Sequence, residues 1–133
     1  MSGRRLPLPA ARVRRVVEAV LRGERRRGSI SITFLGRDAM RRLNLRHTGR
    51  DRPTDVLSFA MTEPSGRAVG DVYLCPWVAE REARSRGIPL GQELVRLLVH
   101  GTLHALGLDH PDDEGRTRSP MWRRQERYVN ALT

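Results

Sequence analysis

The chain has 133 residues, of which 38% are hydrophobic and 30% charged, and this composition suits one globular domain with a real core. The single cysteine, Cys75, excludes an internal disulfide framework and favours a reducing compartment. No apolar run approaches the roughly 20 residues that cross a bilayer, and no signal-peptide core stands at the start. We therefore expect one domain over residues 1–133, monomeric, cytoplasmic and without membrane contact.

The net charge is +10, from 25 basic and 15 acidic residues, and all 25 basic residues are arginine. A positive field of this size attracts polyanions, above all nucleic acid. Arginine suits phosphate through its planar fork of donors, but its use at every basic position fits a compositional bias better than a specific role. The sign of the charge therefore says more about function than the choice of arginine.

The first predicted element is an amphipathic helix near the start of the chain. Five apolar residues share one helical stripe there: Val13, Val16, Val17, Val20 and Leu21. Alternation over residues 29–35 then predicts a half-buried strand. A second helix is expected over residues 38–46, with Met40, Leu43 and Leu45 facing inward.

The remaining predicted elements follow in order: a polar loop at 47–54, strands at 55–60 and 69–75, and helices at 76–86, 92–106 and about 120–132. The short connection between the two strands predicts an antiparallel pair. Without repeats or a linker, this order predicts an α+β domain in which a small mixed β-sheet packs with helices mainly on one side.

The segment HGTLHALGLDH, residues 100–110, holds three of the four histidines. His100 and His104 are four residues apart on the longest predicted helix, so their rings project from one face. Gly107 is placed to end that helix in a left-handed conformation, after which His110 can return to the same point. Three imidazoles with an open fourth position form the ligand set of a catalytic zinc site. We therefore expect one zinc ion held by His100, His104 and His110 at the helix and the turn after it.

A large class of zinc peptidases shares this spacing, but those enzymes carry a catalytic glutamate where this chain has Gly101. Without that carboxylate, no residue of the motif can pass a proton to a leaving amine. Phosphodiester cleavage needs such a shuttle less than peptide hydrolysis does, so the motif favours a phosphodiester substrate. Asp71 stands alone in an otherwise apolar strand, and we expect it to need a polar partner near the metal or within the fold.

The histidine segment closely resembles the H-G-x-L-H-L-x-G-x-D-H signature of the bacterial YbeY family, rRNA maturation factors described as single-strand endoribonucleases. RDRPTDVLSF (50–59) resembles the second hallmark of that family, and LN (43–44) and GDVYL (70–74) fit its intervening pattern. The resemblance runs from about residue 29 to residue 110. It implies an α+β fold, a zinc ion on the same three histidines, and a role in small-subunit rRNA end processing and ribosome quality control.

The sequence departs from this family pattern in two places. Family members usually begin with a strand, which MSGRRLPLPAA does not predict. They also commonly carry an arginine directly before the loop glycine, where this chain has Thr48. Arg50 and Arg46 flank that position, and we take them as the candidate catalytic residues that handle RNA.

The leading hypothesis is a zinc-dependent single-strand endoribonuclease that acts in rRNA maturation, with RNA, the ribosome or its small subunit as partner. Ribosomal-protein or GTPase partners stay open. A second hypothesis, supported by the missing base and by Thr48, is a non-catalytic ribosome-assembly factor in which zinc only stabilises the fold. A third, a metallohydrolase of peptide or amide bonds, is supported by the histidine spacing alone. Ser58 and Trp122 are interpreted as structural residues.

Overall fold

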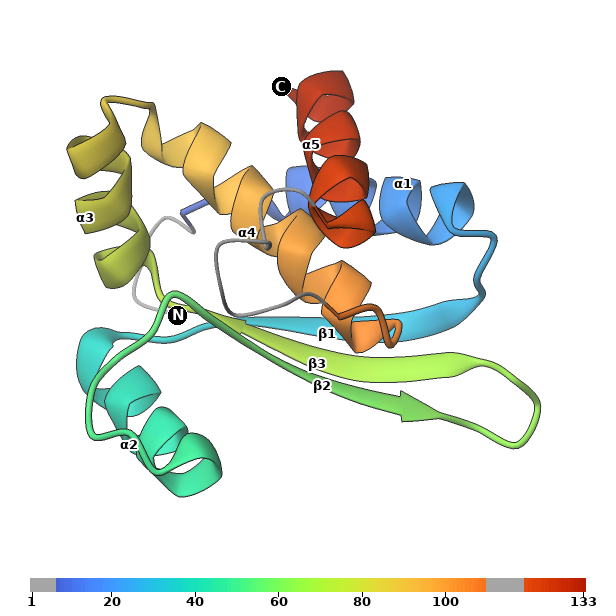
Figure 1. Cartoon of the computed structure of the whole chain (residues 1–133), viewed down its shortest axis with the longest axis horizontal. Coiled ribbons are helices and arrows are strands. Elements are labelled where there is room, and N and C mark those ends of the chain that lie inside the picture. The colour runs from blue at the N-terminus through green and yellow to red at the C-terminus, as the bar shows by residue number, and fades with distance from the viewer. Residues whose placement is uncertain (1–6, 110–118) are drawn as a thin grey trace.

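The computed structural model describes residues 7–109 and 119–133. Its elements in chain order are α1 (Ala10–Gly23), β1 (Gly28–Phe34), α2 (Arg37–Thr48), β2 (Val56–Thr62), β3 (Ala68–Leu74), α3 (Pro76–Arg86), α4 (Leu90–Ala105) and α5 (Pro120–Leu132). Figure 1 shows α1, α4 and α5 on one face of the sheet and α2 on the other side. The predicted α+β class, with helices mainly on one side, is confirmed.

The three strands form one mixed sheet in the order β1-β3-β2. β1 pairs with β3 in parallel, whereas β2 pairs with β3 in antiparallel orientation, as the short connection between them predicts. That connection turns at Gly66, whose φ of 87° is in the left-handed region, and Glu63 donates its backbone N–H to the carbonyl of Arg67. The central strand β3 is thus covered on both edges, and its inward side chains lie under the helices.

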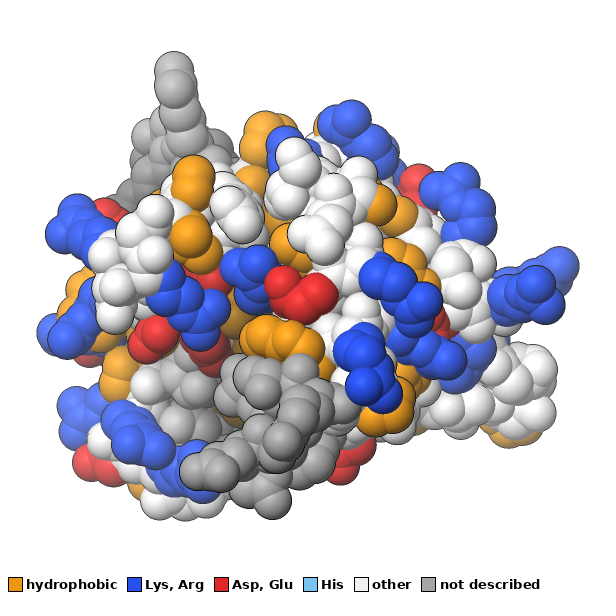
Figure 2. Space-filling view, turned by 45° about the horizontal axis from the view of Figure 1, so that its top comes forward, with side chains coloured by type: hydrophobic (Ala, Val, Ile, Leu, Met, Phe, Trp, Pro, Cys, Tyr) orange, Lys and Arg blue, Asp and Glu red, His pale blue; other side chains and the backbone are white. Residues whose placement is uncertain are grey.

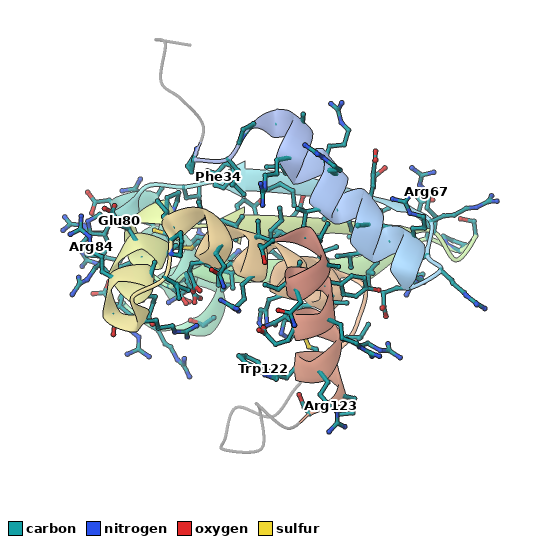
Figure 3. All side chains as sticks on the ribbon, turned by 90° about the horizontal axis from the view of Figure 1, so that it is seen from above. Phe34, Arg67, Glu80, Arg84, Trp122 and Arg123 are labelled. Atoms are coloured by element: carbon teal, nitrogen blue, oxygen red, sulfur yellow. The ribbon has the colours of Figure 1, made fainter. Side chains whose placement is uncertain are left out.

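Helix α4 is the centre of the core because its apolar residues face the sheet and three neighbouring helices. Leu94, Leu98 and Leu103 are fully buried, and α4 packs against α1, α3 and α5 as well as β2 and β3. Seen from above, α1 and α5 flank α4 over the sheet (Figure 3). The predicted stripe of the first helix contributes Val16, Val17 and Val20 to the same core.

Two expectations about inward residues were wrong. Leu45 is 46% exposed, because the inward face of α2 runs through Met40 and Asn44, and the next residue points about 100° away. Asn44 is buried, and its amide donates to the carbonyl of Arg52 at 2.8 Å. Asp71 is exposed on β3, where the alternation of the strand turns it away from α1, α4 and α5, so it has no need of a buried partner.

Helix α4 approaches the sheet closely at Gly101 and Gly70. A Cβ atom added at Gly101 would lie 2.5 Å from Val72 Cγ1 and 3.1 Å from Ser58 Oγ, and one added at Gly70 would lie 2.9 Å from the Cβ of Ala105. The Ser58 hydroxyl donates to the Gly101 carbonyl at 2.8 Å, which ties β2 to the helix. This contact fixes the rotation of α4 about its axis.

The surface carries its arginines in a dispersed pattern. Figure 2 shows arginine side chains over much of one face, with acidic side chains among them. Several of these pairs are exposed, such as Arg41 with Asp51 at 2.7 Å and Arg84 with Glu80 at 2.8 Å, and exposed pairs of this kind contribute little stability. Within residues 7–109 and 119–133, no helix is both long and apolar enough to cross a membrane.

We predict that Gly101→Ala lowers the free energy of unfolding by about 1–3 kcal/mol, because the added methyl group overpacks the contact with Val72. Gly91→Ala on the same helix is the matched control, since a Cβ there meets nothing within 4 Å. It should be neutral or stabilise by up to about 1 kcal/mol through helix propensity. Urea unfolding measures both. Equal stability of the two variants would contradict the close packing.

Glu24, directly after α1, joins that helix to the middle of α5: it accepts a hydrogen bond from the Tyr128 hydroxyl at 2.6 Å and pairs with Arg124 at 2.8 Å. Burial and the Glu24 contact raise the pKa of Tyr128 from 10.0 to about 12. Because the protonated phenol is favoured in the folded state, its contribution to stability is complete below pH 10 and is lost as the pH rises through about 12.

We therefore predict that the wild type loses stability relative to Tyr128→Phe between pH 10 and about 12. Urea unfolding across this range, with Tyr73→Phe as a control that retains the Tyr128 phenol, measures the difference. A constant difference between wild type and Tyr128→Phe from pH 9 to pH 12 would show that the Glu24 contact does not hold the phenol protonated.

Candidate functional site

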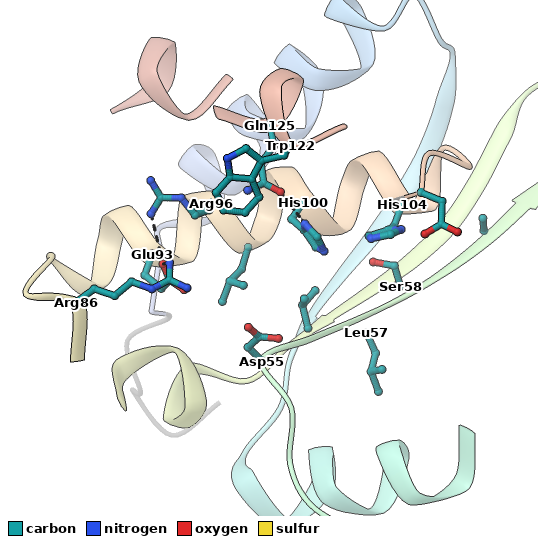
Figure 4. Close-up of a pocket in the computed structure, with 14 residues that line it drawn as sticks. Asp55, Leu57, Ser58, Arg86, Glu93, Arg96, His100, His104, Trp122 and Gln125 are labelled. Carbon is teal, nitrogen blue, oxygen red and sulfur yellow. Dashed lines mark hydrogen bonds and ion pairs between the residues drawn. The ribbon is translucent and has the colours of Figure 1, made fainter. Parts of the chain in front are cut away.

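A cavity of about 390 Å³ lies between α4, α5 and β2. The polar and charged side chains that line it are Asp55, Ser58, Arg86, Glu93, Arg96, His100, His104, Asp109 and Gln125. Figure 4 shows that they come from β2 and the residue before it, the end of α3, one face of α4 and the first half of α5. Asp109 follows α4 in the chain. Residues far apart in the sequence thus meet around one hollow.

His100 and His104 lie side by side in this cavity, as their spacing predicts. Their ring centroids are 4.6 Å apart and the ring planes meet at 71°. Both rings point from α4 toward β2 and Ser58 (Figure 4). They reach this position because the neighbouring residues Gly101 and Ala105 face the sheet, which turns the two histidines toward the cavity.

The third predicted ligand, His110, lies outside the described residues. The turn before it has the predicted form: Gly107 has a φ of 96°, and the N–H of Leu108 returns to the carbonyl of Leu103. Among the residues that the structure describes, no group of three or more His, Cys, Asp or Glu side chains is close enough to hold a metal ion. The described part of the chain therefore brings together two of the three predicted ligands.

Gln125 determines which ring nitrogen of His100 carries the proton. Its amide nitrogen donates to the Glu126 carboxylate at 3.0 Å, so its oxygen faces His100 Nδ1, at 2.6 Å. An amide oxygen can only accept, and Nδ1 is therefore the protonated nitrogen of the neutral ring. The lone pair is then on Nε2, which is the tautomer that a metal ligand needs when its other nitrogen donates to the protein.

An ion-pair network continues from Gln125 along α4. Arg96 donates to both carboxylate oxygens of Glu126, at 3.0 and 3.1 Å, and lies 3.4 Å from Glu93. Glu93 is 2% exposed, and its burial raises its pKa although Arg86 and Arg96 lower it. The hydrogen bond to Glu126 raises the pKa of Arg96. Arg96 is thereby fixed, and it holds Glu126 in place behind Gln125.

Sequence reasoning missed these supporting residues. Glu93 is two helical turns before His100 on the same face of α4, so extending the histidine stripe backward would have found it. Gln125 gave no such signal, because its contact with His100 spans 25 residues of sequence. Trp122, which the sequence suggests is a packing residue, is half-buried and also lines the cavity.

The structure does not bring Arg46 and Arg50 into the cavity. Both are exposed, at the end of α2 and in the loop after it, and neither lines the hollow. Thr48 is the last residue of α2. Its hydroxyl lies 2.8 Å from the backbone carbonyl oxygen and from the side-chain amide oxygen of Asn44, and it accepts the N–H of Arg50 at 3.3 Å. The catalytic role of the two arginines stays a prediction.

Gly101 faces the sheet and not the cavity. The position where peptidases of similar spacing carry their glutamate is filled here by Val72 and Ser58, so packing as well as sequence excludes a base from it. The Ser58 hydroxyl donates to the Gly101 carbonyl, which agrees with the structural role inferred for this serine.

Comparisons with known proteins agree on one family. A family model described as Endoribonuclease YbeY matches residues 6–133. A relative from Paraburkholderia phymatum, named Endoribonuclease YbeY, is 42% identical over 108 residues, or 80% of this chain and 69% of that protein. A relative of the same name from Halorhodospira halophila is 38% identical over 109 residues, covering 77% of this chain and 71% of that protein. The solution structure of a Thermotoga maritima protein aligns with a TM-score of 0.67 and 29% identity, covering 92% of this chain and 79% of that one.

We predict that Gln125→Leu weakens the affinity of this site for a metal ion, tested with zinc, about 10- to 100-fold, because the acceptor that fixes the His100 tautomer is lost. Competition with a chromogenic chelator measures the affinity. Gln92→Leu, on α4 but outside the cavity lining, is the control and should bind zinc like the wild type. Unchanged affinity in Gln125→Leu would mean that the contact does not orient a ligand.

Proposed function

The chain belongs to the endoribonuclease YbeY family, and from this premise we propose that it is a zinc-dependent endoribonuclease of single-stranded RNA that acts in rRNA maturation. The observation that carries the proposal is the pair His100 and His104 in a polar cavity, with Gln125 setting the tautomer of the first ring. We place its action in the cytoplasm on the small subunit or its rRNA, where ribosomal proteins or a GTPase would direct it.

The donor set fits zinc. We assign His100, His104 and His110 as its ligands, since imidazole nitrogens are common zinc ligands and a three-histidine set leaves a position open. When bound, zinc supplies a Lewis acid for the phosphodiester and makes water a nucleophile near neutral pH. The contact between His100 and Gln125 supports this assignment, because it leaves on Nε2 of His100 the lone pair that a metal ligand needs.

The main role of the residues around the histidines is to orient the site, and not to take part in the reaction itself. Gln125 holds the proton on His100 Nδ1, and Arg96 fixes Glu126 behind it. Ser58 anchors the helix at Gly101. Because position 101 faces Val72, no carboxylate can occupy it without disturbing the core, and a peptidase mechanism with a base at this position is disfavoured.

We predict that His100→Ala, His104→Ala and His110→Ala each lose zinc and cleave single-stranded RNA at least about 100-fold more slowly than the wild type, because the ion no longer has its ligands. Metal content by mass spectrometry and gel-based cleavage of a labelled RNA measure the two effects. His47→Ala is the matched control: its ring packs on Phe59 at 4.7 Å and does not line the cavity.

Equal cleavage by wild type and His104→Ala would show that the activity comes from a contaminant. Folded, zinc-loaded protein that binds RNA without cutting it would instead support an assembly factor in which zinc is structural. In that case chelation should unfold the domain. Hydrolysis of peptides or amides without RNA cleavage would support the third hypothesis.

A further inference from the structure

Arg86 is an arginine of the cavity that sequence reasoning did not single out. It is the last residue of α3, and Gly87, with a φ of 67°, turns the chain back toward α4 directly after it. Its guanidinium lies 3.6 Å from the carboxylate of Glu93, and its side chain is 44% exposed. Figure 4 shows this side chain extended along the cavity toward Glu93. Glu93 thus holds the guanidinium of Arg86, while part of the Arg86 side chain is exposed to solvent.

The two arginines of the cavity differ in how their donors are used. Arg96 is only 15% exposed and is bound by both oxygens of Glu126 as well as by Glu93. Arg86 contacts Glu93 alone among the pairs found in the described residues. A guanidinium has five N–H donors, so Arg86 can keep this contact and still bind a second anion with its planar fork.

An RNA phosphate that enters the cavity needs a cation with donors to spare. Asp55, Glu93 and Asp109 line the cavity together with Arg86 and Arg96. Arg46 and Arg50 do not line the cavity, and Arg96 is engaged by two carboxylates. Arg86, which lines the cavity and is 44% exposed, is therefore the arginine placed to bind a phosphate at the end away from His104.

We propose that Arg86 binds a backbone phosphate of single-stranded RNA next to the one that is cleaved. Glu93 and His100 are seven residues apart on α4, which separates them by roughly 10 Å along the helix axis. A guanidinium anchored at Glu93 thus holds a neighbouring phosphate and not the scissile one. This inference rests on the proposed function, and it assigns to Arg86 the substrate-holding role that the sequence suggests for Arg46 and Arg50.

The test compares Arg86→Ala with Arg84→Ala, which removes the same charge from the same helix. Arg84 pairs with Glu80, and both project outward from α3, away from α4 (Figure 3). We expect Arg86→Ala to raise the KM for a short single-stranded RNA about tenfold, the effect of losing one charge-assisted contact, with little change in kcat. Arg84→Ala should leave both constants near the wild-type values.

Binding provides a readout that does not depend on cleavage. The dissociation constant of a nuclease-resistant 2′-O-methyl RNA, followed by fluorescence anisotropy at several salt concentrations, should have a salt slope reduced by about 0.7 in Arg86→Ala, as expected for one lost phosphate contact. Arg86→Lys keeps the charge without the fork and should lie between the wild type and Arg86→Ala.

The two proposals fail in different ways. If the wild type binds and cleaves RNA while Arg86→Ala and Arg84→Ala have the same KM and salt slope, the role of Arg86 is overturned and the proposed function stands. If Arg86→Ala lowers kcat with an unchanged KM, the residue does not hold a neighbouring phosphate, and the inference is also overturned. If the wild type neither binds nor cleaves RNA, the proposed function fails and this inference fails with it.

Discussion

The close contact of α4 with the sheet at Gly101 and Gly70 governs the arrangement of the rest of the molecule. Any side chain at Gly101 would collide with Val72, and any at Gly70 would press on Ala105. The hydrogen bond from Ser58 to the Gly101 carbonyl adds a polar tie at the same place. Because the rotation of α4 about its axis is fixed there, His100 and His104 face the cavity. These histidines directly precede Gly101 and Ala105, the residues that face the sheet. A packing constraint in the core thus sets the direction of the candidate ligands.

The same constraint explains why this site lacks the carboxylate of a peptidase. Position 101 points into the core, where an ionised side chain would be desolvated without a partner. The carboxylates of the site come instead from other elements: Asp55 at the start of β2, Glu93 two turns earlier on α4, and Asp109 after the helix. None of these carboxylates is at position 101, which distinguishes this arrangement from the peptidases whose histidine spacing it shares.

Local pairing, more than net charge, determines what the arginines can do. The net charge of +10 favours polyanions in general, but the arginines are dispersed over the surface among acidic side chains (Figure 2). Within the cavity, Arg96 is engaged by Glu93 and Glu126 and acts as a support. Arg86 has one buried anchor and an exposed side chain. Two arginines of the same cavity therefore have different tasks, which their burial and partners decide.

The sequence by itself determined the α+β class, the antiparallel pair β2 and β3, and the two histidines that share a face of α4, because periodicity and short connections are local properties. It also identified Gly107 as the left-handed end of that helix region, a requirement of the backbone alone. Only the tertiary structure decided that Gln125 orients His100 and that Arg86, not Arg46 or Arg50, lines the cavity. These contacts join residues of different elements, and their geometry depends on how α3, α4 and α5 pack. Local patterns carry no information about that packing, which is why it could not be read from the sequence.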